Sequence, residues 1–148
     1  MVVCVHIPRF KLTVAAGGRA EVGRQVLVGR ALALAPMVGG DLRVGEVSGP
    51  AEAHGVSAGM ALGEALARCP ELELVPADPL AVADAWEGVV RALEGIGAAV
   101  EPAREGLAYF QADELRGMYG SDVHTIAVAR RALGLAVRIG RASCRERV

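Results

Sequence analysis

Four side chains of types that commonly bind metal ions are spread along the sequence: Cys4, His6, His54 and Cys69. Cys4 and His6 are two residues apart in an apolar run, so a strand would place both on one face. The spacing of the set differs from that of a compact zinc site. We therefore expect no metal centre, and we expect His6 to be half-buried at a strand end and hydrogen-bonded to the backbone.

Carboxylates are the second group that could do chemistry. Glu105 lies in a short turn segment, and Asp113 and Glu114 follow soon after. The sequence contains no phosphate-cradling GxxxxGK followed by Ser or Thr, no GxGxxG, no HExxH and no GxSxG. Taken alone, the residues indicate none of these common catalytic sites.

The composition is that of a folded globular protein. The 148 residues are 53% hydrophobic and 22% charged, which excludes disorder of the whole chain. A formal net charge of −1 argues against a polybasic nucleic-acid arm or a membrane-surface patch. No apolar run reaches the roughly 18 residues of a membrane span. Three cysteines without CxxC spacing favour a reducing, cytoplasmic location.

The last ten residues, 139–148, lack the apolar periodicity of the segment before them. They read like the in-frame translation of a sequencing-adapter oligonucleotide, so we expect a non-native tail and a natural protein that continues differently and further. A natural polar tail is the alternative. Without this segment, which holds three Arg and one Glu, 13 basic and 16 acidic side chains remain, a net charge of −3.

The hydrophobic pattern predicts alternating short strands and helices. The most regular helix begins at Asp78-Pro79, an N-cap acid followed by proline at the first helical position, and it has one apolar and one charged face. Ser121 is expected to cap another helix. The remaining predictions are strands at 2–7, 25–28, 31–36, 42–47, 72–74, 100–103, 107–111 and 135–138, and helices at 10–15, 50–54 and 58–68.

The second half of the chain therefore has the predicted order helix, strand, strand, helix, strand, and the strand at 2–7 can join its sheet. This order is typical of a ferredoxin-like β-α-β-β-α-β layer, with residues 20–77 inserted after the first strand. The sequence predicts an α/β fold of the α+β kind with a small inserted lobe.

The insert contains the most specific string of the sequence, Gly-Val-x-x-Gly-Met-x-Leu-x-Glu-Ala-x-x-x-Cys-Pro at 55–70, followed by Leu-Val-Pro-Ala-Asp-Pro at 74–79. Together with segments 2–10, 22–28 and 108–110, this string resembles the N-terminal part of Y-family (UmuC/DinB-like) translesion DNA polymerases.

The resemblance covers about residues 2–138 and implies a domain organisation. A ferredoxin-like palm would comprise residues 1–19 and 79–138, with a small fingers lobe at 20–78. A thumb and a little-finger DNA-binding domain would follow beyond a C-terminal truncation, in place of the tail at 139–148.

Active members of this family resemble one another in an acid at the end of the first strand and an Asp-Glu pair before Ala-Tyr. These acids hold the two divalent cations that nucleotide transfer requires. The resemblance places the first acid at His6 and the pair at Gly106 and Leu107, directly before Ala108-Tyr109. A neutral imidazole and a leucine cannot replace hard oxygen ligands, so we expect neither catalytic residues nor metal ligands here.

The family positions that contact the nucleotide triphosphate fall on Gly49 and Glu52. The second is a charge reversal, because a carboxylate repels a phosphate where arginine would pair with it. The resemblance therefore implies no nucleotide-binding residue and no cofactor in this chain. Mg²⁺ would be expected only if the polymerase site were active.

Loss of the acids with retention of the scaffold resembles the ImuB-type branch of the family, and so does the run Leu115–Gly120. Members of that branch act as non-catalytic mutasome adaptors in damage-induced (SOS) mutagenesis. The resemblance implies a sliding clamp, a RecA-like partner and an error-prone replicative-type polymerase as partners. Damaged or primed DNA would bind through the missing C-terminal domains, without membrane contact.

Two alternatives stay open at this stage. A divergent but active error-prone DNA polymerase would use Glu105 and a further acid. A stand-alone α/β binding domain would require residues 1–138 to fold alone and the locus to end soon afterwards. The net charge of −3 predicts weak DNA binding by this region. Weak binding would not count against the adaptor hypothesis.

Overall fold

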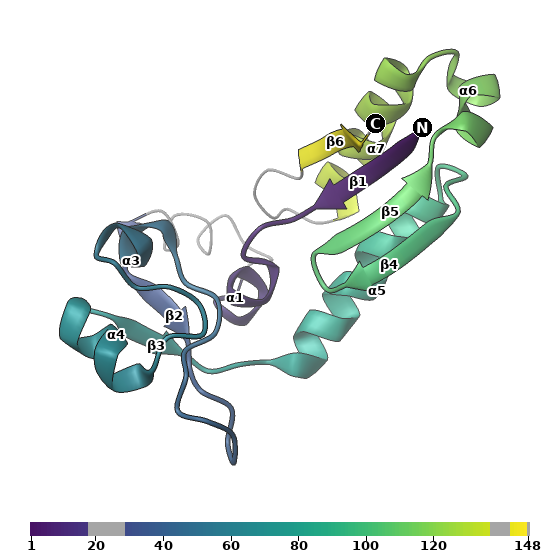
Figure 1. Ribbon diagram of the computed structural model, residues 1–148. Helices are drawn as coiled ribbons and strands as arrows, with labels where there is room; N and C mark the ends of the chain where they lie inside the picture. The colour runs from purple at the N-terminus through teal and green to yellow at the C-terminus, as the bar shows by residue number, and fades with distance from the viewer. Residues whose placement is uncertain (18–28, 137–142, 148) are drawn as a thin grey trace. The chain divides into compact units, whose positions relative to one another are not determined.

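The computed structural model describes residues 1–17, 29–136 and 143–147, and it describes side chains as far as residue 134. The chain divides into two compact units, shown in Figure 1. Unit 1 comprises Met1–Pro8 and Ala83–Val148, and unit 2 comprises Arg9–Val82. The domain limits at 19/20 and 78/79 stay predictions from the resemblance.

Unit 1 is built on an antiparallel sheet with the strand order β4-β5-β1-β6. Its strands and helices in chain order are β1 (Val2–His6), α5 (Pro79–Glu94), β4 (Val100–Arg104), β5 (Leu107–Gln111), α6 (Asp113–Tyr119), α7 (Asp122–Ala136) and β6 (Ser143–Arg147). Apart from the short α6, this is the β-α-β-β-α-β order of a ferredoxin-like layer. The predicted fold class is confirmed. In Figure 1 the purple β1 lies between the green β5 and the yellow β6.

The core of unit 1 follows from the alternation of side chains along β1 and β5. Val3 of β1 pairs with Phe110 on the neighbouring β5, and Val5 pairs with Ala108. All four side chains are 0–2% exposed. The helices contribute further buried side chains to this unit, among them Val89 and Leu93 of α5 and Ala129 and Leu133 of α7. The α5 residues belong to the apolar face that the sequence predicts.

Unit 2 contains a pair of parallel strands, β2 (Leu32–Leu34) and β3 (Glu73–Val75). Its helices are α1 (Phe10–Ala15), α3 (Gly49–Ala53) and α4 (Leu62–Arg68). Leu12 of α1 packs against Leu32 and Leu34 in one buried cluster. A second cluster lies beneath α3 and α4 and contains Ala33, Val44, Val47, Ala51, Val56, Ala65, Cys69 and Leu72.

The strand predicted at 42–47 is wrong, because the structure has only isolated bridges there. The segment changes its hydrogen-bonding partner part-way. The N–H of Val44 donates to the carbonyl of Met60, whereas the N–H of Gly45 donates to the carbonyl of Leu34 in β2. Each contact stays a single bridge, Arg43 with Ala61 and Val47 with Ala33, so neither neighbour is paired over the consecutive residues that a strand requires.

The structure also corrects one of the predictions near the C-terminus. The strand predicted at 135–138 is wrong for its first two residues, which are the end of α7. Alanine and leucine in this stretch are strong helix formers and prolong the helix. Residues 137–138 and the strand predicted at 25–28 lie outside the described residues. β6 pairs with β1 from within the segment 139–148, whose non-native origin stays a prediction.

Helix length in the described part of the chain also bears on membrane insertion. None of these helices is both long enough and apolar enough to cross a bilayer.

Candidate functional site

Three of the positions singled out by sequence meet at one end of the sheet in unit 1. His6, the last residue of β1, pairs directly with Leu107, the first residue of β5. The N–H of Ile7 donates to the carbonyl of Gly106 at 2.8 Å. Residues about 100 positions apart in the sequence are thereby held side by side.

The turn between β4 and β5 determines what the chain can place there. Gly106 has φ +88°, a left-handed conformation that glycine adopts without steric cost. An L-amino acid at this position pays roughly 1–2 kcal/mol for the same backbone. The turn conformation therefore accounts for glycine at position 106.

His6 is exposed, which corrects the expectation that it is half-buried. Because Val3 and Val5 of β1 point into the core, the even-numbered His6 points to the opposite face. Leu107, directly opposite on the same face, is half-buried. At this end of the two strands, the paired side chains on that face are therefore one imidazole and one alkyl group.

Neighbouring carboxylates do not complete a cation site. Glu105 is half-buried in the turn itself, two residues before Leu107. Asp113 and Glu114 follow the opposite end of β5, so the sheet separates them from His6 by the length of the strand. In the regions with described side chains, no three His, Cys, Asp or Glu residues gather closely enough to hold a metal ion. The donor set at His6, Gly106 and Leu107 does not fit Mg²⁺, which prefers oxygen ligands.

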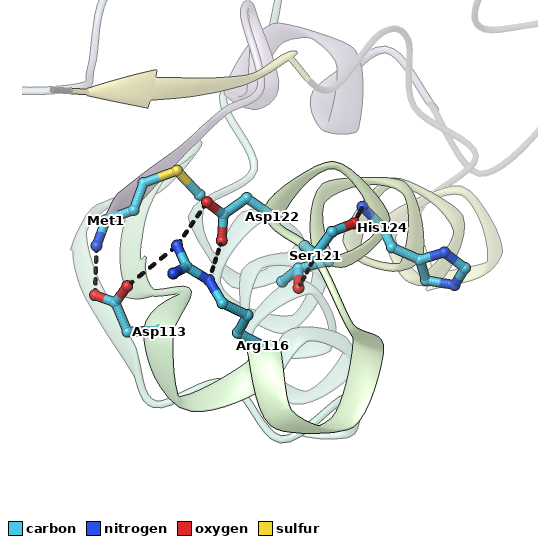
Figure 2. A network of polar contacts seen from close by, with 7 residues as sticks. Met1, Asp113, Arg116, Ser121, Asp122 and His124 are labelled. Atoms are coloured by element: carbon cyan, nitrogen blue, oxygen red, sulfur yellow. Dashed lines mark hydrogen bonds and ion pairs between the residues drawn. The ribbon is translucent and has the colours of Figure 1, made fainter.

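Asp113 instead belongs to a polar network at the start of α6, shown in Figure 2. Its carboxylate accepts a hydrogen bond from the amino group of Met1. Arg116 lies 3.7 Å from Asp113 and makes two hydrogen bonds to Asp122, of 3.0 and 2.7 Å. Ser121 accepts the N–H of His124 at 3.2 Å and caps α7, as predicted.

This network gives the run Leu115–Gly120 a structural role. Leu115 is 2% exposed, and Arg116 ties the end of α6 to the first turn of α7 through Asp122. Gly120 ends α6 with φ +80°. The run therefore forms most of α6 and its C-terminal cap, and within it only Met118 presents a large apolar side chain to solvent.

The contacts in this network lower the pKa of the Asp113 carboxyl. Its pKa is lowered, mainly by the hydrogen bond from the Met1 amino group and further by that charge and Arg116. A lowered pKa in the folded state means that the contribution to stability is present above the unfolded-state pKa and is lost as the pH falls through the folded-state pKa.

We expect NMR titration of the Asp113 carboxyl to give a lower midpoint in the folded protein than in the urea-unfolded protein. The unfolded chain is the control, because it has the same residue without the Met1 and Arg116 contacts. Equal midpoints would contradict the network.

Gly49 and Glu52, the two positions that the resemblance assigns to triphosphate contacts, lie at the start of α3 in unit 2. Ser48 caps this helix from a fully buried position, accepting the N–H of Leu32 at 2.8 Å and donating to the carbonyl of Arg30 at 2.9 Å. This anchor fixes the first turn of the helix. Gly49 is its first residue and is half-buried, and Glu52 is exposed on its surface.

Glu52 forms an ion pair that the sequence analysis missed. Its carboxylate lies 3.0 Å from a terminal nitrogen of Arg9, and the Nε–H of Arg9 donates to the carbonyl of Val47 at 2.9 Å. Arg9 has φ +54° and precedes α1. No local pattern signals a pair of opposite charges 43 residues apart. Within unit 2, the cation at position 9 is therefore already bound by the acid at position 52.

Comparison with known proteins gives a family match. The sequence matches the family model described as impB/mucB/samB over residues 19–145. No curated protein matches the sequence significantly.

Several solved structures share the fold. A Y-family DNA polymerase chimera of Dbh and Dpo4 has a TM-score of 0.74 at 20% identity, covering 97% of this chain and 40% of its own. A DinB family error-prone DNA polymerase from Sulfolobus solfataricus has a TM-score of 0.72 at 19% identity, covering 98% of this chain and 40% of its own. A Dbh ternary complex has a TM-score of 0.72 at 19% identity, covering 97% and 39% respectively. The chain thus spans about 40% of the length of the polymerases it resembles.

Proposed function

The chain belongs to the impB/mucB/samB family, and we propose that it is a Y-family DNA polymerase-like protein of translesion synthesis and DNA repair that works as a non-catalytic adaptor. One observation carries this proposal. The positions where the resemblance requires three carboxylates are occupied by His6, Gly106 and Leu107, which lie together at the end of β1 and β5.

The chemistry of nucleotide transfer explains how this observation supports the proposal. Two divalent cations must bridge the attacking and leaving oxygens, and protein carboxylates must hold the cations. Imidazole prefers softer metals, and glycine and leucine side chains offer no donor. A protein with these residues can retain the shape of a polymerase without its reaction.

The ion pair of Glu52 with Arg9 supports the same proposal from unit 2. A triphosphate would meet a carboxylate at position 52, and the nearby guanidinium of Arg9 is held by that carboxylate and by the carbonyl of Val47. Because anion binding requires an available cation, this surface favours internal pairing over phosphate binding.

Charge reversal at position 52 tests this part of the proposal. We expect Glu52→Arg to bind a deoxynucleoside triphosphate more tightly than the unchanged chain in calorimetry, because it frees the guanidinium of Arg9 from the carboxylate and adds a second cation. The ion pair is exposed, so the loss of unfolding free energy should be about 1 kcal/mol or less. Glu52→Gln is the neutral control. If Glu52→Arg binds the triphosphate no better than the unchanged chain, the pairing of Glu52 with Arg9 does not control anion binding, and this part of the proposal is contradicted.

The proposed adaptor acts through partners. By resemblance these are a sliding clamp, a RecA-like protein and an error-prone replicative-type polymerase, in the cytoplasm and within the SOS response. Primed or damaged DNA would be bound by regions beyond this chain, since the chain spans about 40% of the polymerases with the same fold. Residues 1–138, with a net charge of −3, lack the surplus of cations that non-specific DNA affinity requires.

A divergent active polymerase is the second candidate, and the place of Glu105 favours it. This carboxylate lies in the β4–β5 turn beside Gly106. If it holds a catalytic cation, Glu105→Ala should abolish primer extension by the protein produced from its genomic reading frame. Glu101→Ala, an exposed acid on the adjacent strand, is the matched control. Under the adaptor proposal neither substitution changes the background rate.

A further inference from the structure

No further inference is drawn: the strongest candidate, the carboxylate of Glu46 at the start of α1 in unit 2, whose Oε2 is buried without a hydrogen-bonding partner while its Oε1 accepts the N–H of Lys11 at 3.1 Å, carries nothing because no feature of the described residues shows which ligand would reach this oxygen.

Discussion

Alanine in place of Phe110 is expected to lower the free energy of unfolding by about 3–5 kcal/mol. Phe110 is 2% exposed in the middle of β5 and faces Val3, which is fully buried on β1. Removal of the ring leaves a cavity between the central strands and the helices that cover them. Urea denaturation should show a lower midpoint with an unchanged dependence on urea concentration.

Tyr109→Ala is the control, because it tests which face of β5 is buried. Tyr109 is the neighbouring residue on the other face of the sheet and is only half-buried, so its loss should cost less than half as much. Similar costs, or a larger cost for Tyr109→Ala, would contradict the register. A slip of one residue exchanges the two faces of a strand.

Two carboxylates introduced at the end of β1 and β5 are expected to create a weak divalent-cation site. His6 and Leu107 are directly opposite in the antiparallel pair, where side chains share one face and their Cβ atoms lie about 5 Å apart. In the double variant His6→Asp, Leu107→Glu, both new carboxylates can bind one Mg²⁺ or Mn²⁺, with water completing the coordination. We expect at least ~10-fold tighter binding of Mn²⁺ in calorimetry than for the unchanged chain.

The neutral variant His6→Asn, Leu107→Gln is the matched control, because it changes size and polarity similarly without adding charge. It should bind Mn²⁺ no better than the unchanged chain. In the absence of metal, the two like charges should also raise the pKa of one carboxyl of the acidic variant. If the acidic and neutral variants bind Mn²⁺ equally, the two positions do not form a site together.

Local sequence signals account for the parts of the fold that were predicted. Asp78 caps α5 by accepting the N–H of Ala81 at 3.0 Å, and Pro79 begins the helix as expected. The β4–β5 hairpin follows from two β-rich runs around a glycine turn at Gly106. These elements depend on residues within a few positions of one another, which the sequence displays directly.

The unpredicted parts depend on residues distant in the sequence. α6 begins without a side-chain cap at Ala112, and its first turn is held by the contact of Asp113 with the Met1 amino group, 112 residues away. The segment 42–47 makes only isolated bridges, to Ala61 and Ala33, instead of a continuous ladder. Neither arrangement has a local signature, so periodicity alone could not show it.

The candidate site shows the same division. The proximity of His6 and Leu107 was expected only through the resemblance, because no periodicity relates β1 to β5. The pairing of Glu52 with Arg9 had no sequence signal, although the charge reversal at Glu52 was visible. The sequence thus indicated which residues occupy these positions, and the structure showed which contacts those residues make.

Primer extension tests the central claim most directly. The locus should first be sequenced past codon 138, so that the protein is produced from its genomic reading frame. The purified protein is then given a primed template, Mg²⁺ and all four deoxynucleotides, with an active Y-family polymerase assayed alongside. We predict binding to the primed DNA and incorporation no faster than without protein. Incorporation that requires Mg²⁺ and is abolished by Glu105→Ala would contradict the adaptor proposal.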